Sequence, residues 1–216
     1  IPHLNGQTWM AEVIEKLDHY RSAIEEEIDS AKGIPLKQVR LRPPLPEPGR
    51  IICMAGNYME GGSSRGDRDS FLKSPSSIIG HGDTVILPDV PAPHFHHEAE
   101  LGVVIGKEAH HVSASEAKNC IFGFLNFIDV SARGLNPNGN NSFWWQKSWD
   151  TFAPIGPSIV TADEISDPQD LGIKLWVNGV LRQDLRTDDM ARSPTGARRQ
   201  LHALGNYLHS LSLIHI

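Results

Sequence analysis

Short apolar segments separated by turn-forming residues dominate the chain after residue 45, and this pattern constrains the fold more than any other feature. Such segments, bounded by Gly, Pro, Asn and Asp, are typical of β-strands. The candidate strands are RIICMAGN (50–57), DTVILP (83–88), AELGVVIG (99–106), IFGFLNFIDVS (121–131), PSIVT (157–161) and IKLWVNGVLRQ (173–183). Asn178-Gly179 in the last segment predicts a hairpin with a type I′ turn. With one short helix expected at 113–120, the sequence predicts a mainly β (α+β) domain.

The N-terminal part has a different periodicity. Apolar residues recur at three- and four-residue spacing over 8–33, which predicts one amphipathic helix that Thr8 caps and Gly33 terminates. These residues are Met10, Val13, Ile14, Leu17, Tyr20, Ile24 and Ile28. Four prolines in LRPPLPEPGR (41–50) then exclude a helix and favour an extended linker. We therefore expect a helical N-terminal region, 1–45, in front of the β domain.

Composition narrows the classes of function. The 216 residues carry a formal net charge of −6, with 39% hydrophobic and 21% charged residues. This balance offers no basic face for nucleic acid, and no apolar run is long enough for a membrane helix. Cys53 and Cys120 lie in apolar segments without metal-finger spacing, which indicates buried thiols in a reducing compartment. The predicted location is the cytoplasm, with an organelle matrix as the alternative.

Two glutamates in PHFHHEAELGVVIGKE (93–108) are the strongest candidates for a functional site. Alternate side chains of a strand share a face, so Glu98 and Glu100 point the same way, whereas Ala99 and Leu101 point to the other. Two carboxylates this close repel each other unless a proton or a cation lies between them. An all-oxygen ligand set favours Mg²⁺, Mn²⁺ or Ca²⁺, and Asp129 is a possible third ligand. A solvated strand end or a salt-bridged turn is the alternative.

The neighbouring histidines allow a second interpretation. His94, His96 and His97 could bind a metal together with Glu98, but the chain has no HExxH motif and this stretch follows a proline-rich loop. We expect the three histidines to be loop residues, one of which orients a carboxylate.

Several motifs in order resemble the fumarylacetoacetate hydrolase family. They are FLKSPSSIIGHGDTVILP (71–88), HHEAELGVVIGKEA (96–109), GFLNFIDVSARG (123–134), KSWDTFAPIGPSIVTADEISDP (147–168) and LWVNGVLRQDLRTDDM (175–190). The resemblance runs from about residue 50 to about 192. It implies a β-rich roll with a mixed barrel-like sheet, a homodimer, bound Mg²⁺ (or Mn²⁺ or Ca²⁺), and a small keto or diketo acid as the substrate.

The resemblance also implies roles for individual residues. The family's E-x-E motif falls on Glu98 and Glu100, and the aspartate of its D-V-S/T-A-R motif falls on Asp129; these three would be the metal ligands. Arg133 and Lys147 would be the catalytic and substrate-binding cations. Asn136 stands where some members have a substrate-binding glutamine. Lys73, another recurrent position, would be structural or adjacent to the substrate.

One departure from the family bears on the reaction. Acylpyruvase-like members carry N-Y-x-x-H-x-x-E, in which the His–Glu pair activates water. Asn57 and Tyr58 match this motif, but Gly61 and Ser64 stand at the histidine and glutamate positions. Glu60 and His81 are the nearest substitutes, and neither has the right spacing.

The expected function is accordingly a divalent-metal-dependent hydrolase that cleaves a C–C bond in an acylpyruvate or a fumarylacetoacetate-like diketo acid. The alternative is a decarboxylase, isomerase or dehydratase that acts through a metal-bound enolate. A member that binds a metal and a keto acid without turnover is a further possibility.

The C-terminal stretch lacks the family's closing segments. After residue 192 the sequence has no L-x-P-G-D turn and no T-G-T segment, and it has no Asp or Glu after Asp189. We expect a catalytic domain at 46–192 that is incomplete, followed by an atypical tail at 193–216 from truncation or a frame shift.

Overall fold

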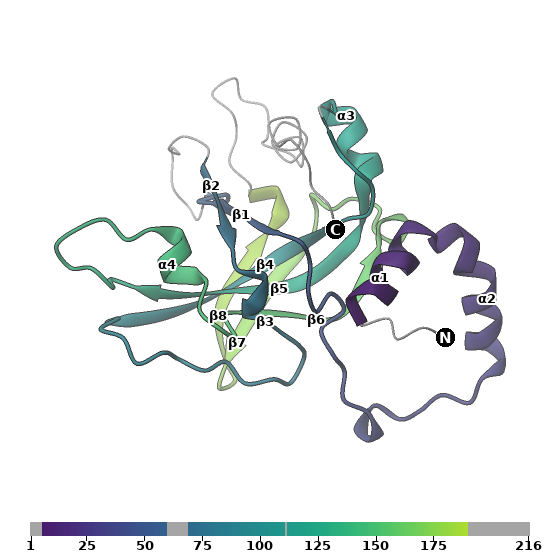
Figure 1. Cartoon of the computed structure of the whole chain (residues 1–216), viewed down its shortest axis with the longest axis horizontal. Coiled ribbons are helices and arrows are strands. Elements are labelled where there is room, and N and C mark those ends of the chain that lie inside the picture. Colours follow the sequence, from purple (N-terminus) through teal and green to yellow (C-terminus); the bar gives the residue numbers. More distant parts are fainter. Residues whose placement is uncertain (1–5, 60–68, 111, 190–216) are drawn as a thin grey trace.

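The computed structural model describes residues 6–59, 69–110 and 112–189. Its strands are β1 (Ile51–Ala55), β2 (Asp69–Lys73), β3 (Ile78–Ile79), β4 (His94–Ile105), β5 (Ile121–Arg133), β6 (Ala153–Thr161), β7 (Gly172–Val177) and β8 (Val180–Arg186). Its α-helices are α1 (Gly6–Glu15), α2 (Leu17–Ser30), α3 (Ala114–Ala117) and α4 (Phe143–Lys147). Short 3₁₀ helices cover Leu36–Gln38, Pro75–Ser77, Lys118–Cys120, Ala162–Glu164 and Thr187–Asp189. The prediction of a mainly β domain behind a small helical region is confirmed (Figure 1).

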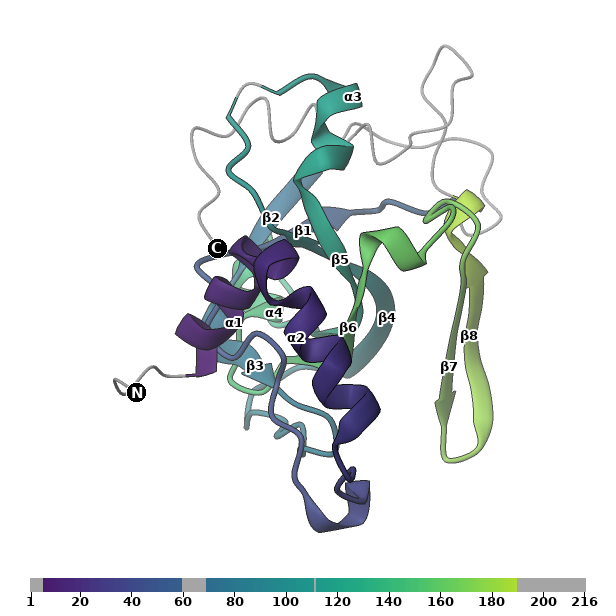
Figure 2. The same ribbon diagram turned by 90° about the vertical axis from the view of Figure 1, so that its right-hand side faces the viewer.

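A four-stranded mixed sheet in the order β3-β6-β5-β4 is the centre of the fold. β3 runs parallel to β6, whereas β6, β5 and β4 are antiparallel neighbours. β1 and β2 pair in a separate antiparallel ribbon, and β7 and β8 form an isolated hairpin. Figure 2 shows this hairpin standing beside β4, away from the N-terminal helices.

The long β4–β5 pair carries a core on both of its faces. On one face Val104, Leu125 and Phe127 join Cys53 and other buried residues in the main apolar cluster. On the other face Val130 and Ala132 pack with Leu135 and Phe152. Because Val104 lies on the same face as Glu98 and Glu100, the face that carries the two carboxylates also contributes to the main apolar cluster. The expected division into one apolar face and one carboxylate face is therefore too simple.

The N-terminal region departs from the prediction of one helix over 8–33. Two helices, α1 and α2, meet at Lys16, and Ala31 caps α2 with an extended backbone, so Gly33 does not terminate it. Only Ile14 of the two helices is buried, where it shares the main cluster with Leu45 of the proline-rich linker. Ile24 and Ile28 are 40% and 71% exposed, so the C-terminal half of the apolar stripe of α2 faces solvent.

The strand predictions were mostly correct. Asn178 and Gly179 have φ angles of 52° and 78°, as the predicted type I′ hairpin turn requires. The prediction of a strand at 83–88 is wrong, since this segment forms no strand and Ile86 and Leu87 are exposed. The sequence analysis missed β2, β3 and α4. Both cysteines are free and buried, as predicted.

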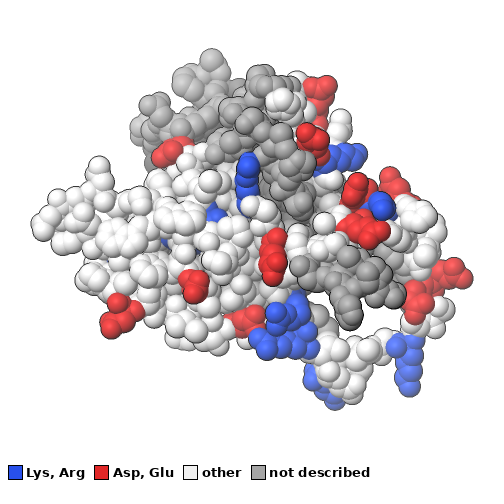
Figure 3. Space-filling view, in the orientation of Figure 1, with Lys and Arg blue, Asp and Glu red and all other residues white. Residues whose placement is uncertain are grey.

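The surface charges and the helices of the structure agree with the mixed charge and the lack of long apolar runs in the sequence. Acidic and basic side chains are interspersed on the face in Figure 3, with acidic residues gathered over α1 and α2. Among the described residues, none of the helices combines the length and the apolar character needed to cross a membrane. The boundary at residue 45 remains a prediction, and the tail at 193–216 lies outside the described residues.

Candidate functional site

Three carboxylates converge at the middle of the β4–β5 pair. The register of the two strands places Glu98 directly opposite Asp129, and Glu100 follows two residues later on the same face. One carboxylate oxygen from each residue lies within 4.8 Å of the others. The Asp129 side chain is 1% exposed, whereas that of Glu98 is 31% exposed. Strand register alone therefore assembles the triad, with its open side at Glu98.

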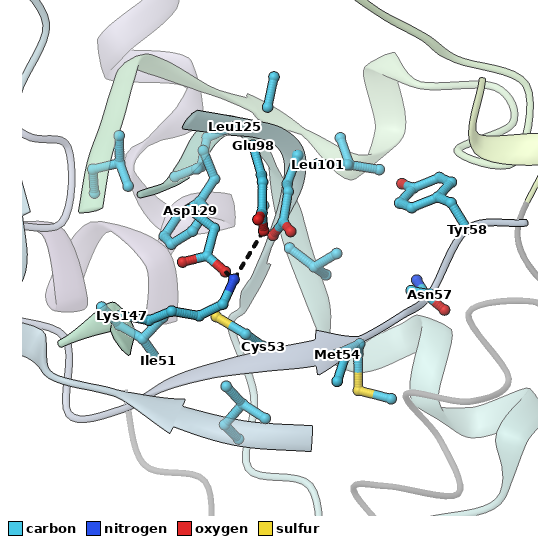
Figure 4. Close-up of a pocket in the computed structure, with 18 of the residues that line it drawn as sticks. Ile51, Cys53, Met54, Asn57, Tyr58, Glu98, Leu101, Leu125, Asp129 and Lys147 are labelled. Carbon is cyan, nitrogen blue, oxygen red and sulfur yellow. Dashed lines mark hydrogen bonds and ion pairs between the residues drawn. The ribbon is translucent and has the colours of Figure 1, made fainter. Parts of the chain in front are cut away.

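Three cations face the three carboxylates. The Lys73 Nζ atom donates to Asp129 Oδ1 at 2.7 Å and to the Val130 carbonyl at 3.1 Å. The Lys147 Nζ atom donates to Glu98 Oε2 at 2.8 Å and to the second oxygen of Asp129. Arg133 Nη2 donates to Glu98 Oε1 at 2.5 Å. Figure 4 shows Lys147 pointing between Glu98 and Asp129.

Glu100 differs from the other two carboxylates. Within the described parts of the chain it has no hydrogen-bond or ion-pair partner. Burial, together with the negative charge of Asp129, raises the pKa of Glu100 to about 8. This carboxyl group is therefore the member of the triad that most lacks a cation.

The pKa shifts of Glu98, Lys147 and Lys73 reflect a balance between burial and the ion pairs. Burial alone would raise the pKa of Glu98, but Lys147 and Arg133 outweigh it and lower this pKa. For Lys147, burial opposes the charged form, and Asp129 with Glu98 overcomes it, so the pKa of Lys147 is raised. For Lys73, burial prevails over Asp129 and lowers its pKa. Lys147 is therefore held firmly in its charged form.

Local structure explains how Lys147 reaches the triad. It ends the short helix α4, where the Ser142 hydroxyl caps the first turn by accepting from the Trp145 amide at 3.2 Å. The Gln146 side-chain Nε2 atom donates to the Asn141 carbonyl at 2.9 Å and fixes the loop before the helix. The ammonium group lies 5.1 Å from the Phe71 ring centroid, a cation–π distance. Lys147 is consequently only 3% exposed.

The triad lies in the wall of a cavity of about 1310 Å³. Residues of β1, β4 and β8 line it together with Arg133 and Lys147. Cys53 lies across from the carboxylates and Tyr58 at the far end (Figure 4). Burial, with the nearby charge of Glu100, raises the pKa of Tyr58 to about 12. The cavity thus combines an apolar body with a cluster of charges at one point, an arrangement typical of small-molecule sites.

The structure brings together five of the six predicted site residues. Asn136 does not line the cavity; its side-chain oxygen accepts from the Asn138 amide at 3.2 Å within its own loop. His81 is exposed and does not line the cavity either. Glu60, Gly61 and Ser64 lie outside the described residues. The geometry therefore supports Glu98, Glu100, Asp129, Arg133 and Lys147 as one group, but gives Asn136 no place in it.

The expectation that the three histidines are loop residues is wrong, because all of them lie in β4. β4 begins at His94 because this residue pairs with Arg133 at the end of β5. His96 Nδ1 lies 3.8 Å from Glu98 Oε1, beyond hydrogen-bond distance, so the expected histidine that orients a carboxylate remains a prediction. Sequence reasoning also missed Ser131, a fully buried residue whose hydroxyl lies 3.5 Å from Glu98 Oε1. Two-residue alternation from Asp129 could have found it.

The donor chemistry of the triad fits a hard divalent cation. All three donors are carboxylate oxygens, which Mg²⁺, Mn²⁺ and Ca²⁺ prefer. The unpartnered state of Glu100 among the described residues provides a ligand that no protein cation already neutralises. The residues present therefore fit such an ion.

Comparison with known proteins identifies the family. Residues 51–197 match the family described as fumarylacetoacetate (FAA) hydrolase C-terminal. The chain belongs to this family. A mitochondrial oxaloacetate tautomerase of Rattus norvegicus is 36% identical over 162 residues, covering 73% of this chain and 51% of the relative. A protein of Pyrococcus horikoshii is 41% identical over 151 residues, covering 66% of this chain and 65% of its own length.

A solved structure supports the fold. Maleylpyruvate hydrolase from Sphingobium sp. SYK-6, in complex with manganese(II) and pyruvate, superposes with a TM-score of 0.82 at 34% identity. The alignment covers 99% of this chain and 74% of that one. This chain spans about half the length of the curated tautomerases it matches. The fumarylacetoacetase-like fold predicted from the sequence is confirmed.

Proposed function

We propose that this member of the fumarylacetoacetate hydrolase family is a divalent-cation-dependent enzyme that converts a 2-keto acid through its enolate. The single observation that carries the proposal is the cluster of three carboxylates within 4.8 Å at the wall of a cavity. Glu98, Glu100 and Asp129 would hold the ion, with Mg²⁺ expected and Mn²⁺ or Ca²⁺ as alternatives. When bound, the ion supplies a Lewis acid for the oxygens of the keto acid.

The protein's own cations bind and orient the substrate in this proposal. The Arg133 side chain is 30% exposed and lines the cavity, so its guanidinium group can donate to a substrate carboxylate. Lys147 carries the positive charge that stabilises a developing enolate oxygen from the side of Asp129. The apolar walls around the cluster strengthen both interactions because they exclude water.

Hydrolysis of a C–C bond in an acylpyruvate or fumarylacetoacetate-like acid is the reaction class expected from the resemblance. It consumes one water molecule and requires a base to activate it. A second candidate, isomerisation, moves one proton between carbon and oxygen and consumes no water. The absence of histidine and glutamate at residues 61 and 64 favours this second candidate, as does the similarity to an oxaloacetate tautomerase. Assays with acylpyruvate and with enol-oxaloacetate separate the two reactions.

Manganese binding tests the proposal directly. Free Mn²⁺ is measured by electron paramagnetic resonance with and without oxalate, a stable analogue of the pyruvate enolate. We expect oxalate to tighten Mn²⁺ binding at least tenfold. The double variant Glu98→Gln/Glu100→Gln should not bind Mn²⁺. The matched control Glu25→Gln/Glu27→Gln removes two charges from the exposed helix α2 and should bind like the wild type. Equal Mn²⁺ binding by both double variants would contradict the proposal.

A further inference from the structure

The strand that carries both glutamates lies at the edge of its sheet. β4 pairs with β5 on one side, and no strand of the described ranges pairs with its other side. Every second residue of such a strand directs its backbone N–H and C=O groups away from the sheet. Those groups need partners, and a strand without them is free to bend and twist. The geometry of Glu98 and Glu100 therefore depends on what holds this edge.

A single side chain takes the place of a neighbouring strand here. The Gln183 Oε1 atom accepts from the Ala99 amide at 2.8 Å, and its Nε2 atom donates to the Ala99 carbonyl at 2.7 Å. The amide of Gln183 thus pairs with both backbone groups of one residue, as a peptide unit of an adjacent strand would. Both distances lie in the usual range for N–H···O hydrogen bonds.

Ala99 is the residue between the two glutamates. Its amide belongs to the peptide unit shared with Glu98, and its carbonyl belongs to the unit shared with Glu100. Holding both groups fixes the orientation of two consecutive peptide planes. Since those planes set the directions of the two Cα–Cβ bonds, the two carboxylates keep their separation and their common aim.

The element that presents Gln183 is otherwise independent of the main sheet. β8 pairs only with β7 among the described strands, and Gln183 lies opposite Leu175 in that hairpin. β7 contacts β4, and Figure 2 shows the hairpin beside β4. An apolar side chain would suffice to dock a hairpin, whereas a two-point hydrogen bond also sets its angle and register. A half-buried amide at this position is explained better by orientation than by docking alone.

We propose that Gln183 is a positioning residue that holds the backbone between Glu98 and Glu100 and thereby sets the affinity for the divalent ion. The inference rests on the proposed function, because it assumes that the two glutamates are ligands. Residues that orient metal ligands without touching the ion commonly change affinity by 10–100-fold when they are replaced.

The test compares two variants of the same hairpin. Gln183→Met keeps the length of the side chain and removes both hydrogen bonds, whereas Ile173→Ala removes half-buried apolar surface from β7 and leaves Ala99 untouched. Mn²⁺ affinity is measured by electron paramagnetic resonance, and the melting temperature of each metal-free protein is recorded. We expect Gln183→Met to weaken Mn²⁺ binding at least tenfold, and Ile173→Ala to lower the melting temperature without changing affinity.

The outcomes separate the inference from the proposed function. Wild-type protein that binds no Mn²⁺ would overturn the proposed function and the inference with it. Wild-type affinity in Gln183→Met would overturn the inference alone, as would equal weakening in both variants, since Gln183 would then only dock the hairpin. If Gln183→Met does not melt cooperatively, Mn²⁺ affinity is measured on Gln183→Glu, which retains the acceptor for the Ala99 amide and loses the donor to the Ala99 carbonyl. Wild-type affinity in this variant would overturn the inference, and weaker binding would support it.

Discussion

Replacing Lys73 with methionine should destabilise the protein far more than replacing a surface lysine. The Lys73 and Asp129 side chains are 0% and 1% exposed, and the Nζ–Oδ1 distance is 2.7 Å. Methionine has a similar length and fits apolar surroundings, so the change removes the charge with little loss of packing. What remains is a buried aspartate that has lost one of its two cations.

The magnitude follows from the burial of the pair. Removing one partner of a buried ion pair costs about 3–5 kcal/mol, because the other charge stays buried without compensation. Lys147 still donates to Asp129, which places the expected loss near the lower end, at about 3 kcal/mol. For a protein of this size, each kcal/mol lowers the melting temperature by about 2–4 °C. Lys73→Met should therefore melt roughly 6–12 °C below the wild type.

Urea unfolding measures the free energy directly, and Lys174→Met is the matched control. Lys174 pairs with Asp184 at 3.3 Å, but both side chains are 49% exposed, so its loss should cost at most about 1 kcal/mol. A further variant, Lys73→Met/Asp129→Leu, replaces both charges by apolar groups and should recover part of the loss. If Lys73→Met lost no more free energy of unfolding than Lys174→Met, the argument from burial would be refuted.

Three other predictions test different parts of the structure. The pKa of Glu100 is raised to about 8 in the folded state, so its contribution to stability is fully present below its unfolded pKa and is lost as the pH rises toward 8. The free energy of unfolding in urea should therefore fall with pH over this range, by at most about 1.4 kcal/mol per pH unit, and this slope should flatten in Glu100→Gln. Lys147→Met should bind Mn²⁺ about tenfold more tightly while losing turnover, because the ammonium group that donates to two of the carboxylates is gone; weaker binding in the same titration would contradict this. Gly123→Ala would place a Cβ atom 2.3 Å from the Val160 carbonyl oxygen, so it should cost about 1–3 kcal/mol in urea, and a neutral effect would show that β5 and β6 can separate freely.

The sequence was informative wherever a structural feature depends on neighbouring residues. Two-residue alternation placed Glu98 and Glu100 on one face, and Asn178-Gly179 located the hairpin turn. Asp129 was a possible third ligand from the residues alone and also matches the family's motif, and the structure explains its position by the pairing of β4 with β5. Local patterns and motif order together were therefore sufficient for the fold class and for most of the cluster.

Features that depend on distant contacts were not predictable. Lys73 stands 56 residues before Asp129, and although the resemblance marked it as a recurrent position, nothing in the sequence predicted its ion pair with Asp129. The segment 83–88 is a short apolar run of the kind typical of a strand, but a strand also requires a partner, and none of the described strands pairs with it. The break between α1 and α2 at Lys16 could not be predicted either, because no glycine or proline lies there. In each case tertiary packing decided the outcome.

The balance of charges explains how such a site can fold before it binds anything. Three carboxylates face three cations, and Asp129 receives two of those cations from opposite sides. Lys73, Lys147 and Arg133 compensate the charges of Glu98 and Asp129, and Glu100, with its pKa raised to about 8, is protonated near neutral pH. Burying this cluster therefore costs much less than burying three ionised carboxylates alone. A divalent ion that displaces the Glu100 proton would leave an excess of two positive charges, which a dianionic ligand such as an enolate would cancel. We therefore expect the ion and the keto acid to strengthen each other's binding, and the fold to be stable without either.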